Sequence, residues 1–336
     1  MGDSDDAEAL AACFATDDHH DYNVGLHVAA LFVIFFFSSL GALTPILASR
    51  YPRLSIPPVL LECGKFFGAG VILATSLIHM LPGAVSNFSS PCAPAVFSEY
   101  SAFPGLFTML AIFLFHLMEH LLTGHFISEK NAPRSHHDHS HHPQAHDHNT
   151  NGHQVLELHS QHTHVHGGAF FSGAENETRR SSTYILEVGI AMHSVLIGLA
   201  LGTASGTEFT SLFIALVIHQ FFEGFALGSR LAELVFKRSA VPVASALIFA
   251  ITTPIGVAIG MGVHSSYQAN SPANLVTQGV LDSIAAGILL YSALVNLIAQ
   301  EFSQASFYRQ SKVRRALFFI SMYTGAAVMA IIGIWA

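Results

Sequence analysis

Eight long apolar stretches divide the chain, and polar segments separate each from the next. Each stretch has about 20 residues, the length that a helix needs to cross a hydrocarbon core about 30 Å thick. Backbone polar groups find no partners in lipid, so a spanning segment must pair them internally as a helix. We predict an all-α integral membrane protein whose eight transmembrane helices lie near residues 25–49, 59–82, 103–124, 184–206, 208–230, 239–263, 273–299 and 314–336.

The composition agrees, because 51% of residues are hydrophobic and only 11% are charged, against about 25% charged in soluble domains. All 14 Lys and Arg residues fall in or beside alternate loops, those after the first, third, fifth and seventh helices. Since positive residues mark cytosolic loops, we expect both termini on the extracellular or luminal side. The start of the chain is acidic rather than basic and then apolar, so we expect the first helix to act as its own insertion signal.

We divide the chain into an acidic extracellular tail (1–24), helices one to three (25–124), a cytosolic loop (125–183) and helices four to eight (184–336). The loop lacks apolar periodicity, which predicts disorder. Twelve histidines lie between residues 136 and 166: His136, His137, His139, His141, His142, His146, His148, His153, His159, His162, His164 and His166. Imidazole binds zinc, iron and related metals, so this segment is a candidate regulatory metal sink or sensor. The alternative is a polar linker.

Two features of the outer side can be tested chemically. Cys13 and Cys92 both fall outside, where a disulfide persists, whereas Cys63 lies near the inner end of the second helix. The pair is therefore a candidate disulfide, the alternative being two free thiols. Asn87 begins an Asn-Phe-Ser sequence in an outer loop and is a candidate glycosylation site.

The polar residues at mid-membrane depth carry the candidate chemistry. An ionisable group there costs several kcal/mol unless it is paired. His219 and Glu223 lie four residues apart on one helix face, with Gln220 beside them, while His193 and Ser194 lie at similar depth on the preceding helix. Two imidazoles, a carboxylate and an amide oxygen suit a divalent first-row metal. Each residue alone has a plainer reading: a hydrogen-bonded histidine, or polar side chains that hold two helices together. Their coincidence favours a metal site.

Other polar residues mark candidate entrances and exits. His79 lies toward the outer end of the second helix, where a ligand at the mouth would stand, although an interfacial histidine needs no function. Glu187, Asn296 and Glu301 lie toward the inner ends of their helices and outline a candidate exit route.

The motifs HSVLIG (193–198) and HQFFEG (219–224) resemble the fourth and fifth helices of the ZIP (Zrt-, Irt-like protein) metal transporters, in particular the eukaryotic iron/zinc-regulated branch. Further similarity covers KFFGAGVILATSLIHMLP (65–82), TTPIGVAIG (252–260) and residues 270–302. The resemblance implies a secondary transporter that brings Zn²⁺, Fe²⁺ or related ions into the cytosol. It also implies an inverted-repeat bundle of 3+2+3 helices and a homodimer.

The family's transport site carries over onto His193, Ser194, His219, Gln220 and Glu223. Ile197 stands where some members have a second carboxylate, so we expect one bound metal rather than two. Asn296 stands where related sequences often have Asp, which leaves Glu301 as the acidic candidate on the seventh helix.

Three other classes are weighed against an influx transporter. Cation-efflux proteins usually have six spans and a soluble C-terminal domain, which do not match this pattern. An intramembrane metallohydrolase needs an open water position, and no HExxH motif occurs. A membrane metal sensor would bind ions without moving them. We expect a plasma-membrane protein that is not an enzyme, has no cofactor and binds no nucleic acid. The sequence leaves the choice among zinc, iron, manganese and cadmium open.

Overall fold

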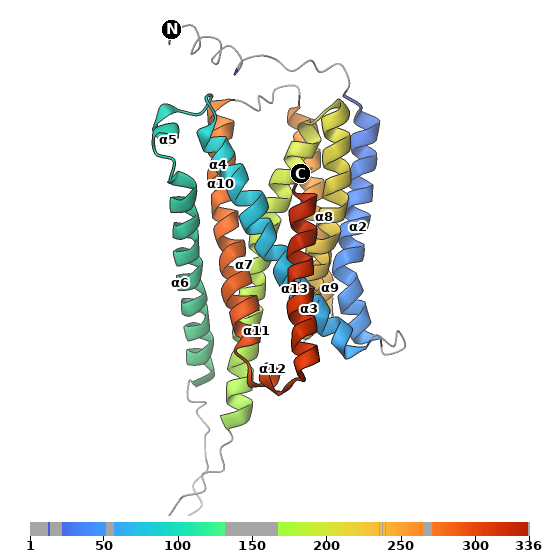
Figure 1. Ribbon diagram of the computed structural model, residues 1–336, viewed down its shortest axis with the longest axis vertical. Helices are drawn as coiled ribbons and strands as arrows, with labels where there is room; N and C mark the ends of the chain where they lie inside the picture. Colours follow the sequence, from blue (N-terminus) through green and yellow to red (C-terminus); the bar gives the residue numbers. More distant parts are fainter. Residues whose placement is uncertain are drawn as a thin grey trace, which may run out of the picture.

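The computed structural model describes residue 13 and residues 22–51, 57–131, 167–234, 236, 238, 240–264 and 271–334, which form helices and no strand (Figure 1). Eight segments are long and apolar enough to span a membrane, which confirms the predicted all-α, eight-helix class. In order, they are α2 (Val24–Arg50), α3–η3–α4 (Pro58–Ala74, Thr75–Met80, Leu81–Ser89), α6 (Phe103–Asn131), α7 (Gly167–Thr203), α8 (Gly206–Glu233), α9 (Ala240–Val263), α10–η4–α11 (Pro272–Tyr291, Ser292–Ala299, Gln300–Phe302) and α13 (Lys312–Ile332). Two short helices, α5 (Ala95–Glu99) and α12 (Ala305–Arg309), lie between spans.

Local sequence accounts for where several helices begin. The side chains of Asn23, Ser271 and Ser311 accept hydrogen bonds from backbone amides in the first turns of α2, α10 and α13. Gly206 has a φ of 57°, a left-handed conformation that costs glycine least, and it turns the chain from α7 directly into α8.

Helices α6 and α7 reach further than we expected. Helix α6 continues to Asn131 and α7 begins at Gly167, so both enter the range 125–183 that we predicted to be a loop. A formed helix extends at little cost once its first turns exist. The missing apolar periodicity therefore marks the end of the membrane span, because the candidate spans run only to Leu121 and from Arg179.

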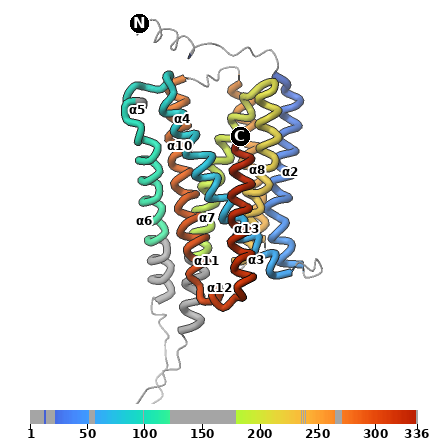
Figure 2. The backbone as a smooth tube through the Cα atoms, in the orientation of Figure 1, coloured from blue at the N-terminus to red at the C-terminus, as the bar shows by residue number. Residues whose placement is uncertain are grey.

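The spans pack in a pattern that repeats between the halves of the chain (Figure 2). Helix α2 packs on α8 as α9 packs on α7, and α3 packs on α13 as α10 packs on α6. Proline lies within both α2 and α9 (Pro45, Pro254), and a π-helix interrupts both the second and the seventh span. These matches support the expected inverted repeat.

Two helix groups follow from this packing. The first group is α2, α7, α8 and α9, and the second group is α3–η3–α4, α6, α10–η4–α11 and α13. We call the end that carries the α4–α5 turn the outer end and the opposite end the inner end, following the predicted orientation.

Glycines set the close contacts within the first group. Gly198 and Gly202 on α7 face α9, where an added Cβ would lie 2.3 Å from the carbonyl oxygen of Thr253 and 2.4 Å from that of Val257, respectively. Glycine permits this approach because α9 presents its own Gly256 and Gly260 at the same crossing.

Candidate metal centre

Three side chains meet at the middle of the bundle. Nε2 of His193 on α7 lies 3.3 Å from Nε2 of His219 on α8, which lies 3.3 Å from Oε1 of Glu223 one turn further along. His193 and Glu223 are 4.0 Å apart through the same atoms, and all three residues are 1% exposed. His193 stands about 21 Å from the inner end of its span and about 15 Å from the outer end, at 1.5 Å per residue. The three therefore form a buried donor set near the middle of the α7 span, and their role as metal ligands stays a prediction.

The spacing of these atoms fits a tetrahedral metal ion. With bonds of about 2.0–2.1 Å, neighbouring ligands of a tetrahedral zinc ion lie about 3.3–3.4 Å apart. Two of the three distances between the ligand atoms already have this length. The distance between His193 and Glu223 must shorten when an ion binds. Within the described part of the chain, this is the one group of three or more His, Cys, Asp or Glu residues that meets the spacing for a shared ion.

His79 lies closer to these residues than its expected place at the outer mouth. Its ring centroid is 5.3 Å from that of His219 and 5.6 Å from that of His193. His79 belongs to the π-helix η3, whose extra residue per turn shifts the side chains that follow. The second helix group thus contributes an imidazole beside a centre built by the first group.

Ser194 and Gln220 lie next to the centre but bond to each other and to α9. The Gln220 amide donates to Ser194 Oγ at 3.4 Å and to the Thr253 hydroxyl. Thr253 was not predicted from the sequence, because a threonine in an apolar helix ordinarily bonds its own backbone. The contacts fix the orientation of Gln220 and leave its carbonyl oxygen for another partner.

Several buried polar atoms of the centre lack a hydrogen-bond partner. Nδ1 of His193, Oε1 of Gln220 and Oε2 of Glu223 are buried without a hydrogen bond. Such atoms are costly inside a protein unless a ligand or ion satisfies them. Ile197 packs in an apolar cluster and adds no donor, so the centre contains a single carboxylate, as the expectation of one metal requires.

Comparison of the sequence with known proteins identifies its family. A family model described as "ZIP Zinc transporter" matches residues 24–333. The chain belongs to the ZIP family. This ZIP protein is 35% identical to "Zinc transporter 5" of Oryza sativa subsp. japonica, over 93% of its own length and 87% of the relative's. It is 34% identical to "Zinc-regulated transporter 1" of Saccharomyces cerevisiae, over 97% and 92% of the two chains. These relatives are transporters and not enzymes.

The predicted exit residues of the ZIP protein lie apart from one another. Glu187 accepts a hydrogen bond from Ser245 at 3.1 Å, within the first helix group. Asn296 lies in the π-helix η4 and donates to Glu119 of α6 at 3.2 Å, so a carboxylate does stand at this depth although position 296 itself is neutral. The sequence indicates this carboxylate by the presence of Glu119, a charged residue, within an apolar helix.

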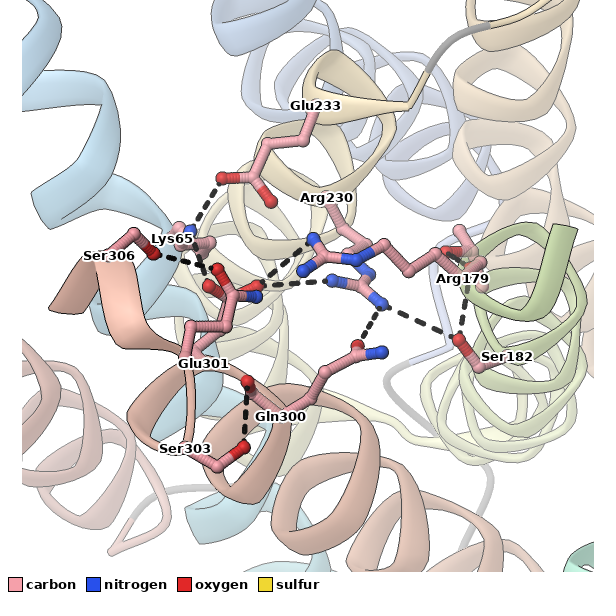
Figure 3. Close-up of polar contacts among 11 residues, drawn as sticks. Lys65, Arg179, Ser182, Arg230, Glu233, Gln300, Glu301, Ser303 and Ser306 are labelled. Carbon is pink, nitrogen blue, oxygen red and sulfur yellow. Dashed lines mark hydrogen bonds and ion pairs between the residues drawn. The ribbon is translucent and has the colours of Figure 1, made fainter. Parts of the chain in front are cut away.

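Glu301 lies in a group of charges at the inner end, the inner ion-pair cluster, shown in Figure 3. Its carboxylate is 6% exposed and lies 2.8 Å from Lys65, 3.4 Å from Arg179 and 3.6 Å from Arg230. Lys65 also contacts Glu233 at 2.8 Å. Three cations therefore surround the carboxylate that we expected to receive metal.

The outer end holds the remaining predicted residues. A disulfide joins Cys13 to Cys92, with 5.6 Å between their Cα atoms, while Cys63 is free. Asn87 lies in the last turn of α4, and its amide donates to Asp282 of α10 at 3.4 Å. Asn87 therefore lies in a helix and not in the outer loop that we expected, and its glycosylation stays a prediction. The predicted regulatory histidines fall between 132 and 166, outside the described residues.

Proposed function

We propose that this ZIP protein carries Zn²⁺ across the membrane into the cytosol, binding it between His193, His219 and Glu223. The observation that carries the proposal is the convergence of three buried donor atoms at zinc-like spacing in mid-membrane. The family membership and the names of its zinc-transporting relatives support it. Glu223 supplies the one negative charge, and the two neutral imidazoles replace the water that the ion must shed.

An outer route to the centre follows one face of the second span. His79 lies against the centre, Gly83 lies one turn further out, and a Cβ at Gly83 would be 3.7 Å from the Asp282 carboxylate. Asp282 is an acidic side chain within the seventh span, where a charge is costly and points to a function, and it accepts a hydrogen bond from the neutral amide of Asn87. We infer that Asp282 attracts the ion and that His79 passes it to His193 and His219.

Transport requires that the centre open first to one side and then to the other. Close glycine contacts pack α2 on α8 and α7 on α9, which favours movement of the first helix group as one unit, and His79 reaches the centre from the second group. Movement of the first group against the second would withdraw the centre from His79 and turn it toward the inner end. Glu187 and the histidine-rich loop then remain candidates to receive the metal.

Two alternative functions fit the centre less well. A metallohydrolase needs water at the metal, whereas the three donors are 1% exposed. A membrane sensor would use the same donors without moving the ion, and uptake measurements separate it from a transporter. Transport of iron, manganese or cadmium, a plasma-membrane location and a homodimer remain proposals from the family resemblance.

The test is uptake of ⁶⁵Zn in cells that lack their own high-affinity zinc and iron uptake, with ⁵⁵Fe measured in parallel. Glu223→Ala removes the only carboxylate of the centre and should abolish accumulation. Glu208→Ala, which changes an exposed carboxylate in the first turn of the same helix, is the matched control and should retain it. Equal uptake by both variants at equal surface amounts would reject the assignment of the centre.

A further inference from the structure

The inner ion-pair cluster joins the two helix groups. Lys65, on α3 of the second group, contacts Glu233 on α8 of the first. In the opposite direction, Arg179 on α7 and Arg230 on α8 contact Glu301 on α11. Arg230 also donates to the side-chain oxygen of Gln300 at 3.1 Å. Any movement that parts the groups at the inner end must therefore separate these charges.

The inner ion-pair cluster lies on the inner side of the metal centre, and α8 contributes residues to both. Arg230 follows Glu223 by seven residues, about 10 Å along α8. Between them, α8 lies against α3: a Cβ on Gly68 would meet Ala226, and a Cβ on Gly64 would lie 3.5 Å from Ser229 Oγ. The inner side of the centre is thus closed first by close helix packing and then by the cluster.

The energetics of such a cluster suit a contact that forms and breaks. Arg230 is 2% exposed and Glu301 6%, so both lose hydration when the cluster forms. The attraction between buried ions only about compensates for that loss, whereas removal of one partner strands the others. Parting the groups into water restores hydration to all the charges together. The complete cluster is therefore stable when closed and when fully hydrated, and unstable in between.

We propose that the inner ion-pair cluster is the reversible inner closure of the transport path, which holds the two helix groups together until the metal leaves. This inference rests on the proposed function, because it assumes that the centre opens to the inner side. It assigns Lys65 and Glu301 a role in setting the balance between closed and inner-open forms. It also replaces the role of Glu301 as a metal ligand.

A cysteine placed at the group boundary can report opening without any transport. Ser229→Cys is nearly isosteric, is 6% exposed, and lies between the centre and the cluster. In a Cys63→Ser background, the disulfide-bonded Cys13 and Cys92 do not react with a maleimide, so labelling reports position 229 alone. Permeabilised membranes give the reagent access to the inner side.

Variants of the cluster should change the labelling rate in a fixed order. Lys65→Met breaks the pairs with Glu233 and Glu301 and should speed labelling roughly threefold, which is near the middle of the range for one exposed ion pair. Lys65→Glu places a third carboxylate there and should label fastest. Lys65→Glu combined with Glu233→Lys restores a pair across the groups and should slow labelling again. Lys312→Met, an exposed inner-end lysine at the start of α13, is the control and should match the parent.

Identical labelling rates across the Lys65 series, or equal acceleration by Lys312→Met, would overturn the proposal. Recovery of slow labelling in the double variant excludes simple misfolding of Lys65→Glu. The measurement needs no metal, so it can succeed even if zinc uptake fails, and the two proposals are therefore tested separately.

Discussion

Asp282 offers a quantitative test of the outer route. Asp282→Asn removes one negative charge and preserves size and the ability to accept the hydrogen bond from Asn87. Gly83, beside Asp282, lies about 6 Å from His79 along the helix, and the His79 ring centroid lies 5.3 Å from that of His219. The charge therefore acts on an ion in the centre from about 11 Å along this path. At that distance a divalent ion and a carboxylate attract by about 0.8 kcal/mol in water and about 3 kcal/mol at an effective dielectric constant of about 20.

Because Asp282 is partly exposed, we take the lower figure as the minimum effect. It corresponds to a rise in KM for zinc uptake of about fourfold or more, with an unchanged maximal rate, since the centre itself is intact. The assay is initial ⁶⁵Zn uptake against zinc concentration, normalised to surface protein. Glu99→Gln, which neutralises an exposed outer carboxylate on α5, should leave KM unchanged.

A second substitution makes this test more stringent. An added Cβ at Gly83 meets only Asp282 Oδ2, at an ordinary contact distance of 3.7 Å. Gly83→Asp can therefore place a carboxylate near the one lost in Asp282→Asn, and the double variant should recover a low KM. An unchanged KM in Asp282→Asn would refute the outer route, and failure of the double variant would refute the proposed position of the charge.

Three further predictions concern packing, acidity and the disulfide. Gly198→Ala should lower the free energy of unfolding of the detergent-extracted protein by about 1–3 kcal/mol, because the new methyl group overlaps the Thr253 carbonyl. Gly262→Ala, with open space around it, should leave stability unchanged in the same melting experiment. Uptake should resist acidification of the outer medium from pH 7 to about pH 5, since burial opposes protonation of the histidines of the centre, and loss of half the uptake by about pH 6 would show that these ligands titrate as exposed imidazoles. Alkylation and mass spectrometry should show Cys13 and Cys92 modified only after reduction, and modification of both before reduction would exclude the bridge.

The eight spans and the central donors could be predicted from sequence because each depends on local pattern. A long run of apolar residues predicts a membrane helix, and the four-residue spacing of His219 and Glu223 predicts that both lie on one face of it. Their meeting with His193 followed from the short turn between α7 and α8.

What could not be predicted depends on contacts between distant segments. The π-helix that brings His79 beside the centre has no sequence signature that we could read. Gly198 allows close approach to any helix, and only the fold selects α9. Glu301 looked like a metal ligand because its three cationic partners come from segments up to 236 residues away.

The single carboxylate of the metal centre divides the voltage dependence of the proposed cycle equally between its loaded and empty halves. Zn²⁺ bound beside Glu223 and two neutral imidazoles carries a net charge of +1, and the empty centre carries −1. A potential that is negative inside therefore drives the loaded centre inward and the empty centre outward, so both halves of the cycle are favoured. Each elementary charge that crosses the full field gains about 2.3 kcal/mol per 100 mV. Two charges per cycle give about 4.6 kcal/mol per 100 mV, enough to concentrate zinc without a coupled ion.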